Sequence, residues 1–166
     1  LFIKMSKSFF LSKKQINDIG FKKVGKDCMI SNLASFISPQ NISISDKVRI
    51  DDFVQLSSYD GAINIGKNSH IGALTFIQGS GKIKIGKNCN ISQGVKIYSK
   101  SDNYNSLIKK QILKETIIKN NVIIGSNAVI LPGAIIESDC RIGALTIVKK
   151  RIKSNSLYYG KKTVIL

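Results

Sequence analysis

Large aliphatic residues recur every six positions along most of this chain, and a small residue follows each of them four places later. Thirteen uninterrupted units begin at Val24, Ile30, Ile44, Ile50, Ile65, Ile71, Ile85, Ile91, Ile118, Ile124, Ile130, Ile136 and Ile142. Five further units begin at Phe36, Leu56, Ile77, Ile97 and Val148, which makes 18 units. No uninterrupted unit has a large side chain at its fifth position, so the pattern extends beyond the spacing of the aliphatic residues.

A six-residue period matches neither the α-helical turn of 3.6 residues nor the two-residue alternation of a single strand. It is typical of short strands joined by tight corners, each pointing one large and one small side chain inward. Three strands per coil build a triangular prism, and 18 units divide into six coils. Stacked coils lie about 4.8 Å apart. We therefore expect an all-β fold, a parallel β-helix of about six coils over residues 24–152.

The segments outside the repeat have different signals. Ser12 and Gln15 form a capping-box pattern, and Gly20 is a plausible helix stop, so we expect a short helix over residues 13–19. This helix belongs to an N-terminal segment, 1–23, that covers the first coil. The residues from Tyr98 to about Glu115 have a loop composition and predict an external loop over 98–116. Residues 153–166 are expected to form a C-terminal tail.

Only the third unit of a coil is followed by extra residues, so every insertion is expected to project from one edge of the prism. A second edge, between the first two units of each coil, collects polar and small residues. In coil order these are Arg49, Asp51 and Asp52, then His70 and Gly72, Asn90 and Ser92, Gly125 and Ser126, and Arg141, Gly143 and Ala144.

His70 is the only histidine in the chain. Imidazole is the side chain best suited to proton transfer near neutral pH, so we predict that His70 is a general base. Asp52, or alternatively Asp51, would hold the second ring nitrogen. The competing interpretation is a surface corner residue without a catalytic role.

Below His70 the side chains of the same edge are small. At Gly125, Ser126 and Ala144 the backbone is therefore open to contact by an extended ligand. Three coils span roughly 14 Å, about the reach of a pantetheine arm. Lys149 and Lys150 then offer cations to a phosphate. Glycine also suits any tight corner, so Gly125 has an alternative, purely structural interpretation. A basic run near a chain end is often simply solvated, and this is the alternative interpretation of Lys149 and Lys150.

The charge of the chain favours anionic partners. Twenty-six basic and 10 acidic residues give a net charge of +16. The basic residues look scattered and are not interleaved with aromatic residues, so we expect no nucleic acid partner.

We find no transmembrane segment and no signal peptide. Three cysteines at small inward positions, an odd number, predict a reducing cytoplasm. We expect no metal site.

The repeat resembles the hexapeptide-repeat family, whose fold is a left-handed parallel β-helix, from Val24 to about Ile152. The handedness comes from this resemblance alone. Members are mostly acyl-CoA-dependent transferases that form trimers and bind CoA between subunits. The segments 122–136 and 142–148 resemble the CoA-side signature of the family. A single histidine excludes the zinc-type carbonic anhydrase of this fold, which needs several.

A more specific similarity is to acyltransferases of nucleotide-linked amino-deoxy sugars, especially those acting on dTDP-4-amino-4,6-dideoxyglucose. The matching stretches are residues 11–21, 48–53, 70–73 and 95–104 and the Leu-Pro-Gly segment at 131–133. Two features depart from related enzymes. The tail from Tyr158 to Ile165 replaces a usual Ala-Gly-Val-Pro-Ala pattern, and the long loop lacks the second histidine of galactoside and maltose acetyltransferases.

The resemblance implies direct transfer from acetyl-CoA to a sugar amine, with His70 Nε2 taking the proton and an N–H near Gly72 and Ala73 binding the oxyanion. Asp51, and Asp102 and Tyr104 on the loop, are candidate sugar or nucleotide contacts across a subunit boundary, or else ordinary turn residues. The expected pathway is the synthesis of a surface polysaccharide such as the O-antigen of lipopolysaccharide. Two alternatives remain: O-acetylation of a sugar hydroxyl in capsule or lipopolysaccharide, and a non-catalytic β-helical scaffold.

Overall fold

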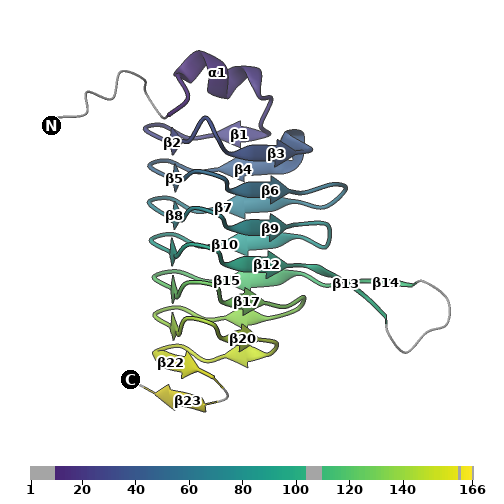
Figure 1. The fold of residues 1–166 in the computed structure, drawn as a ribbon, viewed down its shortest axis with the longest axis vertical. Helices are drawn as coiled ribbons and strands as arrows, with labels where there is room; N and C mark the ends of the chain where they lie inside the picture. Colours follow the sequence, from purple (N-terminus) through teal and green to yellow (C-terminus); the bar gives the residue numbers. More distant parts are fainter. Residues whose placement is uncertain (1–9, 104–109, 161, 166) are drawn as a thin grey trace, which may run out of the picture.

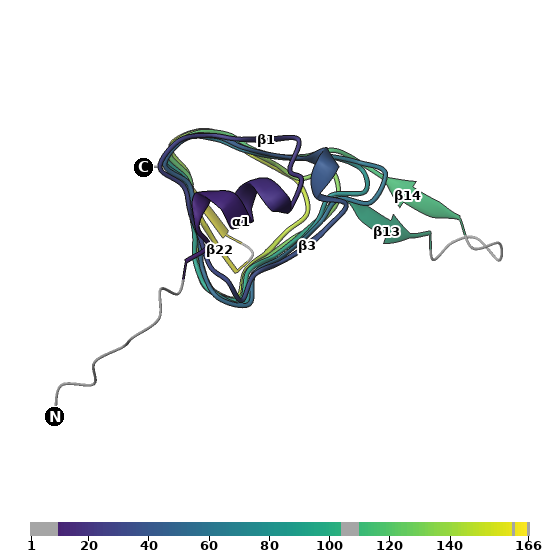
Figure 2. The same ribbon diagram turned by 90° about the horizontal axis from the view of Figure 1, so that it is seen from above.

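The chain folds as a parallel β-helix with three flat sides. The computed structural model describes residues 10–103, 110–160 and 162–165. Each coil contributes one strand to each of three sheets, so strands that follow one another in sequence lie on different sides (Figure 1). Seen from above, the coils superpose as a triangle (Figure 2). The expected parallel architecture of about six coils is confirmed.

The strands are short because each ends at a corner. The first sheet contains β1 (Lys23–Val24), β4 (Ile42–Ile44), β7 (Ile63–Ile65), β10 (Ile83–Ile85), β15 (Thr116–Ile118), β18 (Ile135–Ile136) and β21 (Arg151–Ile152). The second contains β2 (Met29–Ile30), β5 (Arg49–Ile50), β8 (His70–Ile71), β11 (Asn90–Ile91), β16 (Ile123–Ile124), β19 (Arg141–Ile142), β22 (Ser156–Tyr159) and β23 (Lys162–Ile165). The third contains β3 (Ser35–Ile37), β6 (Gln55–Ser57), β9 (Phe76–Gln78), β12 (Lys96–Tyr98), β17 (Val129–Ile130) and β20 (Ile147–Val148).

The register stacks like residues directly above one another. Ile44 pairs with Ile65, which in turn pairs with Ile85, and all three side chains are buried. From the second coil onward every first and fifth position of an uninterrupted unit is buried. Each buried isoleucine contributes roughly 1.5–3 kcal/mol through removal of apolar surface from water, and this column of contacts holds the prism together.

The corners require left-handed backbone at the fourth position of a unit. Between the first and second sheets this position is Asn68, Asn88 and Asn121 in the central coils, with φ of 58°, 56° and 57°. Asparagine tolerates this conformation better than most residues. Their amides form a ladder, since Asn68 donates to Asn88 at 3.1 Å and Asn88 donates to Asn121 at 3.0 Å.

The added elements close the ends and mark the third corner. Helix α1 (Lys13–Asp18) covers the first coil and has the expected capping box between Ser12 and Gln15. The short 3₁₀-helix η1 (Pro39–Asn41) and the antiparallel pair β13 (Lys100–Asp102) and β14 (Gln111–Leu113) lie at the corner between the third and first sheets. All insertions project from this corner, as expected (Figure 2).

The segment 153–166, expected as a tail, contains ordered strands. Tyr158 follows Ile152 by six residues, pairs with Ile142 and is buried, so it continues the inward stack of the repeat. Strand β23 then pairs antiparallel with β22 and ends the second sheet. An aromatic residue at a first position hid this unit from the aliphatic pattern.

Candidate functional site

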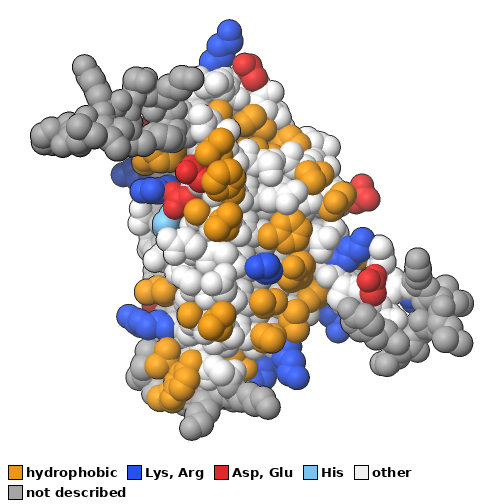
Figure 3. Space-filling view, in the orientation of Figure 1, with side chains coloured by type: hydrophobic (Ala, Val, Ile, Leu, Met, Phe, Trp, Pro, Cys, Tyr) orange, Lys and Arg blue, Asp and Glu red, His pale blue; other side chains and the backbone are white. Residues whose placement is uncertain are grey.

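The prism has three edges, and each carries a different chemistry. We call the corner between the first and second sheets the asparagine edge, and the corner between the second and third sheets the histidine edge. The prediction that the polar and small residues gather between the first two units of a coil is wrong for the corner residues: Asp51, Gly72 and Gly125 follow strands of the second sheet and so lie on the histidine edge. The corner between the third and first sheets is the loop edge. In Figure 3 the single histidine lies beside acidic and basic side chains on one side of a band of hydrophobic side chains.

His70 is held between the coils above and below it on the outer face of the second sheet. Its backbone pairs with Arg49 on one side and Asn90 on the other. Nε2 lies 2.7 Å from Asp51 Oδ2, and Nδ1 lies 3.1 Å from Asn90 Oδ1. The side chain keeps 38% of its surface exposed, so a substrate can reach the ring. Both ring nitrogens face oxygen acceptors, an arrangement that fits the protonated imidazolium.

The Asp51 carboxylate contacts both Arg49 and His70. Arg49 Nε donates to Oδ1 at 2.7 Å, while Oδ2 faces His70. Partial burial by itself raises the pKa of Asp51, but the hydrogen bonds and positive charges of Arg49 and His70 outweigh it and hold the pKa below its usual value. Asp51 is therefore ionised in neutral solution and able to stabilise a charged imidazole ring.

The preference for Asp52 as the partner of His70 is not what the structure shows. Asp52 points toward the first coil, where Ser31 Oγ donates to its Oδ1 at 2.5 Å. Asp51, the alternative, contacts the ring, and it does so at Nε2, the atom expected to take the proton. Asp51 and Asp52 lie in the corner that follows β5, where the backbone turns, so the sequence alone does not say which of them meets the ring.

A hollow of about 340 Å³ opens beside this cluster. Its lining residues are Phe10, Arg49, Asp51, Asp52 and Ala73. Gly72 N–H and Leu74 N–H donate to the backbone oxygens of Ile91 and Asp52. In the described part of the chain, neither Ala73 N–H nor Thr75 N–H donates a hydrogen bond; Thr75 is buried, whereas Ala73 lines the hollow, so its N–H is available to a ligand.

The small residues expected on the coenzyme side lie along the lower histidine edge. Gly125 stacks so closely on Ala144 that a side chain at Gly125 would come within 2.5 Å of the Ala144 nitrogen. Corner packing alone therefore explains this glycine. Ser126 and Ala144 occupy equivalent places in successive coils, and Leu145 N–H donates to Ser126 O at 3.0 Å.

The bottom of the third sheet ends in an apolar hollow with a basic side. Strand β20 forms the lower edge of this sheet, since β22 turns into β23 instead of adding a further strand beneath it. A volume of about 540 Å³ is lined by Leu145, Ile147, Lys149, Lys150, Tyr158 and Gly160. Lys150 lies 5.9 Å from the Tyr158 ring, within cation–π range. Lys149 and Lys150 thus share this hollow with Leu145 of the lower histidine edge, whereas Gly125, Ser126 and Ala144 do not line it.

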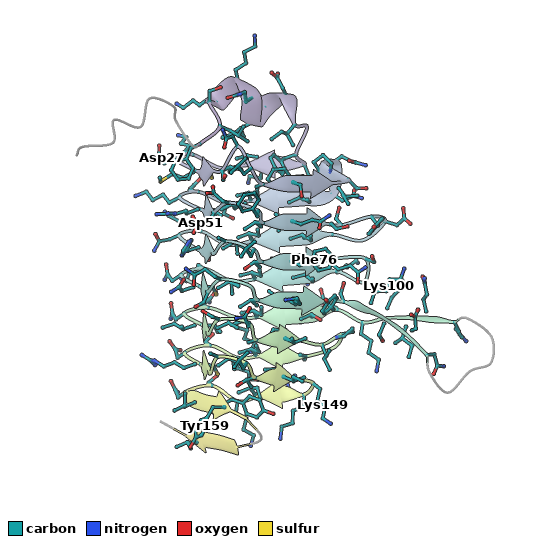
Figure 4. The ribbon with its side chains drawn as sticks, viewed as in Figure 1. Asp27, Asp51, Phe76, Lys100, Lys149 and Tyr159 are labelled. Carbon is teal, nitrogen blue, oxygen red and sulfur yellow. The ribbon has the colours of Figure 1, made fainter. Side chains whose placement is uncertain are left out.

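The loop residues lie on the other side of the prism. Asp102 is exposed on β13, which leaves the loop edge, and Tyr104 lies outside the described residues. Figure 4 shows Asp51 and Lys100 on opposite sides of the prism. Asp102 therefore does not approach the His70 of its own chain.

The asparagine edge carries an unexpected row of lysines. Turns on this edge contain Lys26, Lys47, Lys67, Lys87, Lys119 and Lys153, all exposed. Basic residues are thus aligned here rather than scattered. Acidic residues interrupt the row, because Asp27, Asp46 and Asp139 share the edge and Glu137 lies 3.8 Å from Lys119. The row is therefore only a weak argument for a polyanion partner.

Within the described ranges, no group of three or more histidine, cysteine, aspartate or glutamate side chains is arranged to hold a metal ion. In the same part of the chain, no helix has the length and apolar character to span a membrane. Cys28, Cys89 and Cys140 are free thiols, and burial raises the pKa of each.

Comparisons with known proteins agree with the repeat. A family model described as bacterial transferase hexapeptide (six repeats) matches residues 115–150, and one described as hexapeptide repeat of succinyl-transferase matches 62–99. The dTDP-4-amino-4,6-dideoxy-D-glucose acyltransferase of Escherichia coli is 35% identical over 161 residues, which cover 91% of this chain and 84% of the relative. The bifunctional protein GlmU of Clostridium acetobutylicum is 30% identical over 135 residues, only 26% of its length.

Solved structures match over nearly the whole chain. AntD, an N-acyltransferase from Bacillus cereus, is 33% identical with a TM-score of 0.89 in a complex with dTDP-4-amino-4,6-dideoxyglucose and coenzyme A. The match covers 96% of this chain and 90% of AntD. A complex of AntD with dTDP and 3-hydroxybutyryl-CoA matches with a TM-score of 0.88. The expected left-handed parallel β-helix is thereby confirmed.

Proposed function

The chain belongs to the family of hexapeptide-repeat acyltransferases, and from this premise we propose that it transfers an acyl group from acyl-CoA to the amine of a dTDP-linked 4-amino-4,6-dideoxy sugar. One observation carries the proposal. His70 is partly exposed and hydrogen-bonds an ionised Asp51, and a hollow with apolar walls and two lysines lies at the lower end of the same prism, where Leu145 of the histidine edge forms one wall. This arrangement provides a base at one end and a coenzyme path at the other.

In the proposed reaction the free amine of the sugar attacks the thioester carbonyl carbon. A C–N bond forms, the carbonyl oxygen becomes an oxyanion that Ala73 N–H stabilises, and His70 takes the proton released by the amine. Collapse of the intermediate breaks the C–S bond, and the proton passes to the departing thiolate. The products are the amide and free CoA. No covalent intermediate forms on the protein.

The contacts of His70 support Nδ1 as the base atom. Nε2–H donates to Asp51, which leaves the lone pair of the neutral ring on Nδ1, beside Asn90. When the ring gains a proton, Asp51 and the Asn90 carbonyl both accept from the imidazolium. Asp51 would act as the aspartate of a serine-protease triad does, by fixing the tautomer and stabilising the charged ring.

We propose a homotrimer with sites between subunits. The histidine edge has large apolar residues at fourth positions: Phe53, Leu74 and Leu145 have φ of 57°, 62° and 57° and are 59%, 63% and 78% exposed. A bulky residue in left-handed backbone is unfavourable, and exposing it gains nothing. The left-handed corners of the asparagine edge carry only polar residues (Asp27, Lys47, Asn68, Asn88, Asn121 and Asp139), whereas those of the histidine edge include these three exposed apolar residues beside Gly94 and Asn127. Contact with another copy would explain the three apolar side chains.

A trimer also resolves the position of Asp102. The hairpin carrying it leaves the loop edge at the level of the fourth coil, and the adjacent subunit would present its His70 at a similar height. The AntD structures include variants at a serine and at an aspartate ten positions further along that chain. Ser92, one coil below Gly72, and Asp102 have the same spacing here. We propose that both contact the amino sugar, as would Tyr104, from two subunits.

For the coenzyme, we propose that the pantetheine arm runs past Ser126 and Ala144 and that Lys149 and Lys150 bind the phosphates of CoA.

The free thiols support an intracellular, cytoplasmic enzyme. Acetyl and 3-hydroxybutyryl groups are both candidates for the transferred acyl group, and O-acylation of a sugar hydroxyl is the alternative reaction. A non-catalytic scaffold would bind no CoA.

The test is release of free thiol from acetyl-CoA or 3-hydroxybutyryl-CoA with dTDP-4-amino-4,6-dideoxyglucose, other amino-sugar nucleotides and free galactosides as acceptors. We expect turnover with an amino-sugar nucleotide, a product stable to mild alkali as an amide is, and a loss of about two to four orders of magnitude in kcat in His70→Ala. An alkali-labile product indicates the O-acyl alternative. Absence of CoA binding contradicts the enzyme altogether.

A further inference from the structure

The residues that lead into helix α1 lie against the first coil, on the same sheet as His70. Phe10 forms an antiparallel bridge with Ser31, and Leu11 N–H donates to Ile30 O at 2.8 Å. Leu11 also packs against the buried core. Because β2 is the end strand of the second sheet, Phe10 and Leu11 cover its free edge. This contact holds Phe10 at a fixed place close to the second coil.

The ring of Phe10 lies over the guanidinium of Arg49. The Arg49 Cζ atom is 5.8 Å from the ring centroid, within cation–π range. Arg49 keeps 53% of its side-chain surface exposed, and a free arginine side chain has many rotamers. The ring on one side and the Asp51 carboxylate on the other restrict these rotamers. Phe10, Arg49 and Asp51 also line the same hollow of about 340 Å³.

Arg49 acts on the His70 ring through Asp51. Arg49 Nε donates to Asp51 Oδ1 at 2.7 Å, and Asp51 Oδ2 lies 2.7 Å from His70 Nε2. A carboxylate with one partner on each oxygen cannot rotate without breaking a hydrogen bond. Without Arg49, the carboxylate would be free to turn away from Nε2, and the tautomer of the ring would no longer be fixed.

The charge of Arg49 changes what Asp51 does to the ring. A guanidinium stays protonated at every pH used for proteins, so it offsets part of the negative charge beside His70. The other charged side chain at this hollow is Asp52, and Asn90, which contacts the ring from the next coil, is uncharged. Loss of Arg49 would therefore strengthen the hold of Asp51 on a protonated ring. A ring that keeps its proton cannot accept another from the sugar amine.

We propose that Arg49 and Phe10 are positioning residues for the base: the guanidinium, held under the Phe10 ring, fixes Asp51 on His70 Nε2 and moderates its charge. The inference rests on the proposed function for its effect on turnover only. The contacts of Phe10 with Ser31 and Arg49 then give the first coil a part in the reaction, in addition to closing the end of the prism.

His70 is the only histidine, so the ring proton signals in an NMR spectrum report on it directly. Titration with pH compares wild type, Arg49→Met and Arg49→Lys. Arg141→Met is the matched control, an exposed arginine on the same face of the second sheet. We expect the midpoint of the His70 signals to move to higher pH in Arg49→Met. It should stay near that of wild type in Arg49→Lys, which keeps the charge, and in Arg141→Met. A midpoint that does not move in a folded Arg49→Met overturns the proposal.

Turnover measurements test the positioning itself. We expect kcat to fall about tenfold in Arg49→Met, with the KM of both substrates little changed and the acid limb of the kcat profile moved to higher pH. Arg49→Lys should keep the wild-type acid limb but recover kcat only in part, because an ammonium lacks the planar shape that stacks and donates together.

Phe10 is tested by Phe10→Leu and Phe10→Tyr. We expect Phe10→Leu to lower kcat about two- to fivefold, the size of an exposed cation–π contact, and Phe10→Tyr to match wild type. Equal rates in the two variants remove Phe10 from the assignment.

The two readouts separate this inference from the proposed function. Wild type in which the His70 midpoint responds to Arg49→Met, but which acylates no amino sugar, leaves the Arg49–Asp51–His70 coupling standing and refutes the proposed reaction. Wild type that acylates the sugar, with full turnover and an unchanged pH profile in Arg49→Met, overturns the positioning role alone.

Discussion

Asp51 of the second coil hydrogen-bonds Nε2 of His70 in the third coil at 2.7 Å, and its other oxygen accepts from Arg49. The aspartate next to it in sequence is committed to Ser31 instead. Two neighbouring carboxylates at one corner therefore have separate roles, and mutation can distinguish them.

Replacing Asp51 should damage catalysis far more than replacing Asp52. Asp51→Asn keeps the shape of the side chain but removes the charge that stabilises imidazolium, and we expect kcat to fall about 100-fold or more. Asp52→Asn is the matched control and should retain most of the activity. Steady-state rates with saturating substrates give the comparison. Equal losses in the two variants would contradict the assignment of Asp51.

Acid should weaken the fold in part through Asp51. Its folded pKa lies below the ordinary value of about 3.9, so its contribution to stability is complete above that value and is lost as pH falls through the folded pKa. Thermal unfolding between about pH 3 and pH 7 should show wild type above Asp51→Asn at neutral pH, with a gap that narrows below about pH 4. A gap that stays constant across this range would show that the carboxylate charge is irrelevant.

The histidine edge should be required for assembly but not for folding. Leu74→Asn places a residue suited to left-handed backbone at an exposed corner, so the subunit should remain folded while the oligomer dissociates. Lys47→Asn makes the same kind of change at a left-handed corner of the asparagine edge and should leave the oligomer intact. Light scattering and circular dichroism measure the two properties. A trimeric Leu74→Asn, or a monomeric wild type, would exclude this interface.

The basic end of the apolar hollow should govern coenzyme affinity. We expect Lys149→Met with Lys150→Met to raise KM for acyl-CoA by about tenfold, the effect of losing charge-assisted phosphate contacts, while kcat changes little. Lys153→Met, an exposed lysine on the asparagine edge, is the control. An increase in KM for the nucleotide sugar rather than for acyl-CoA would reverse the assignment of the two ends.

Direct transfer predicts that no cysteine is needed. Cys89 and Cys140 are buried in the prism and burial raises their pKa, so both should resist a thiol reagent in the native protein and react after denaturation. The triple variant Cys28→Ala, Cys89→Ala and Cys140→Ala should keep its activity. Loss of activity in a variant that remains folded would point to an acyl-enzyme.

The sequence by itself determined the coil architecture. A six-residue period with one large and one small inward position leaves few ways to bury the aliphatic residues, and the position of the extra residues places every loop on one edge. The same period placed His70 above Asn90 and near both aspartates. It missed Tyr158, because an aromatic side chain replaces the aliphatic residue there.

Only the tertiary structure decided which side chains meet. Asp51 and Asp52 differ by one position, and their directions depend on the backbone of the corner rather than on the period. The backbone of the corners also decides three further features. These are the left-handed conformation of Phe53, Leu74 and Leu145, the lysine row on the asparagine edge, and the hollow beside Asp51. Burial of the core depends on the repeating pattern of large and small residues along the chain, which the sequence shows directly. The geometry of a site depends on where individual side chains point, and this follows from the three-dimensional stacking of the coils.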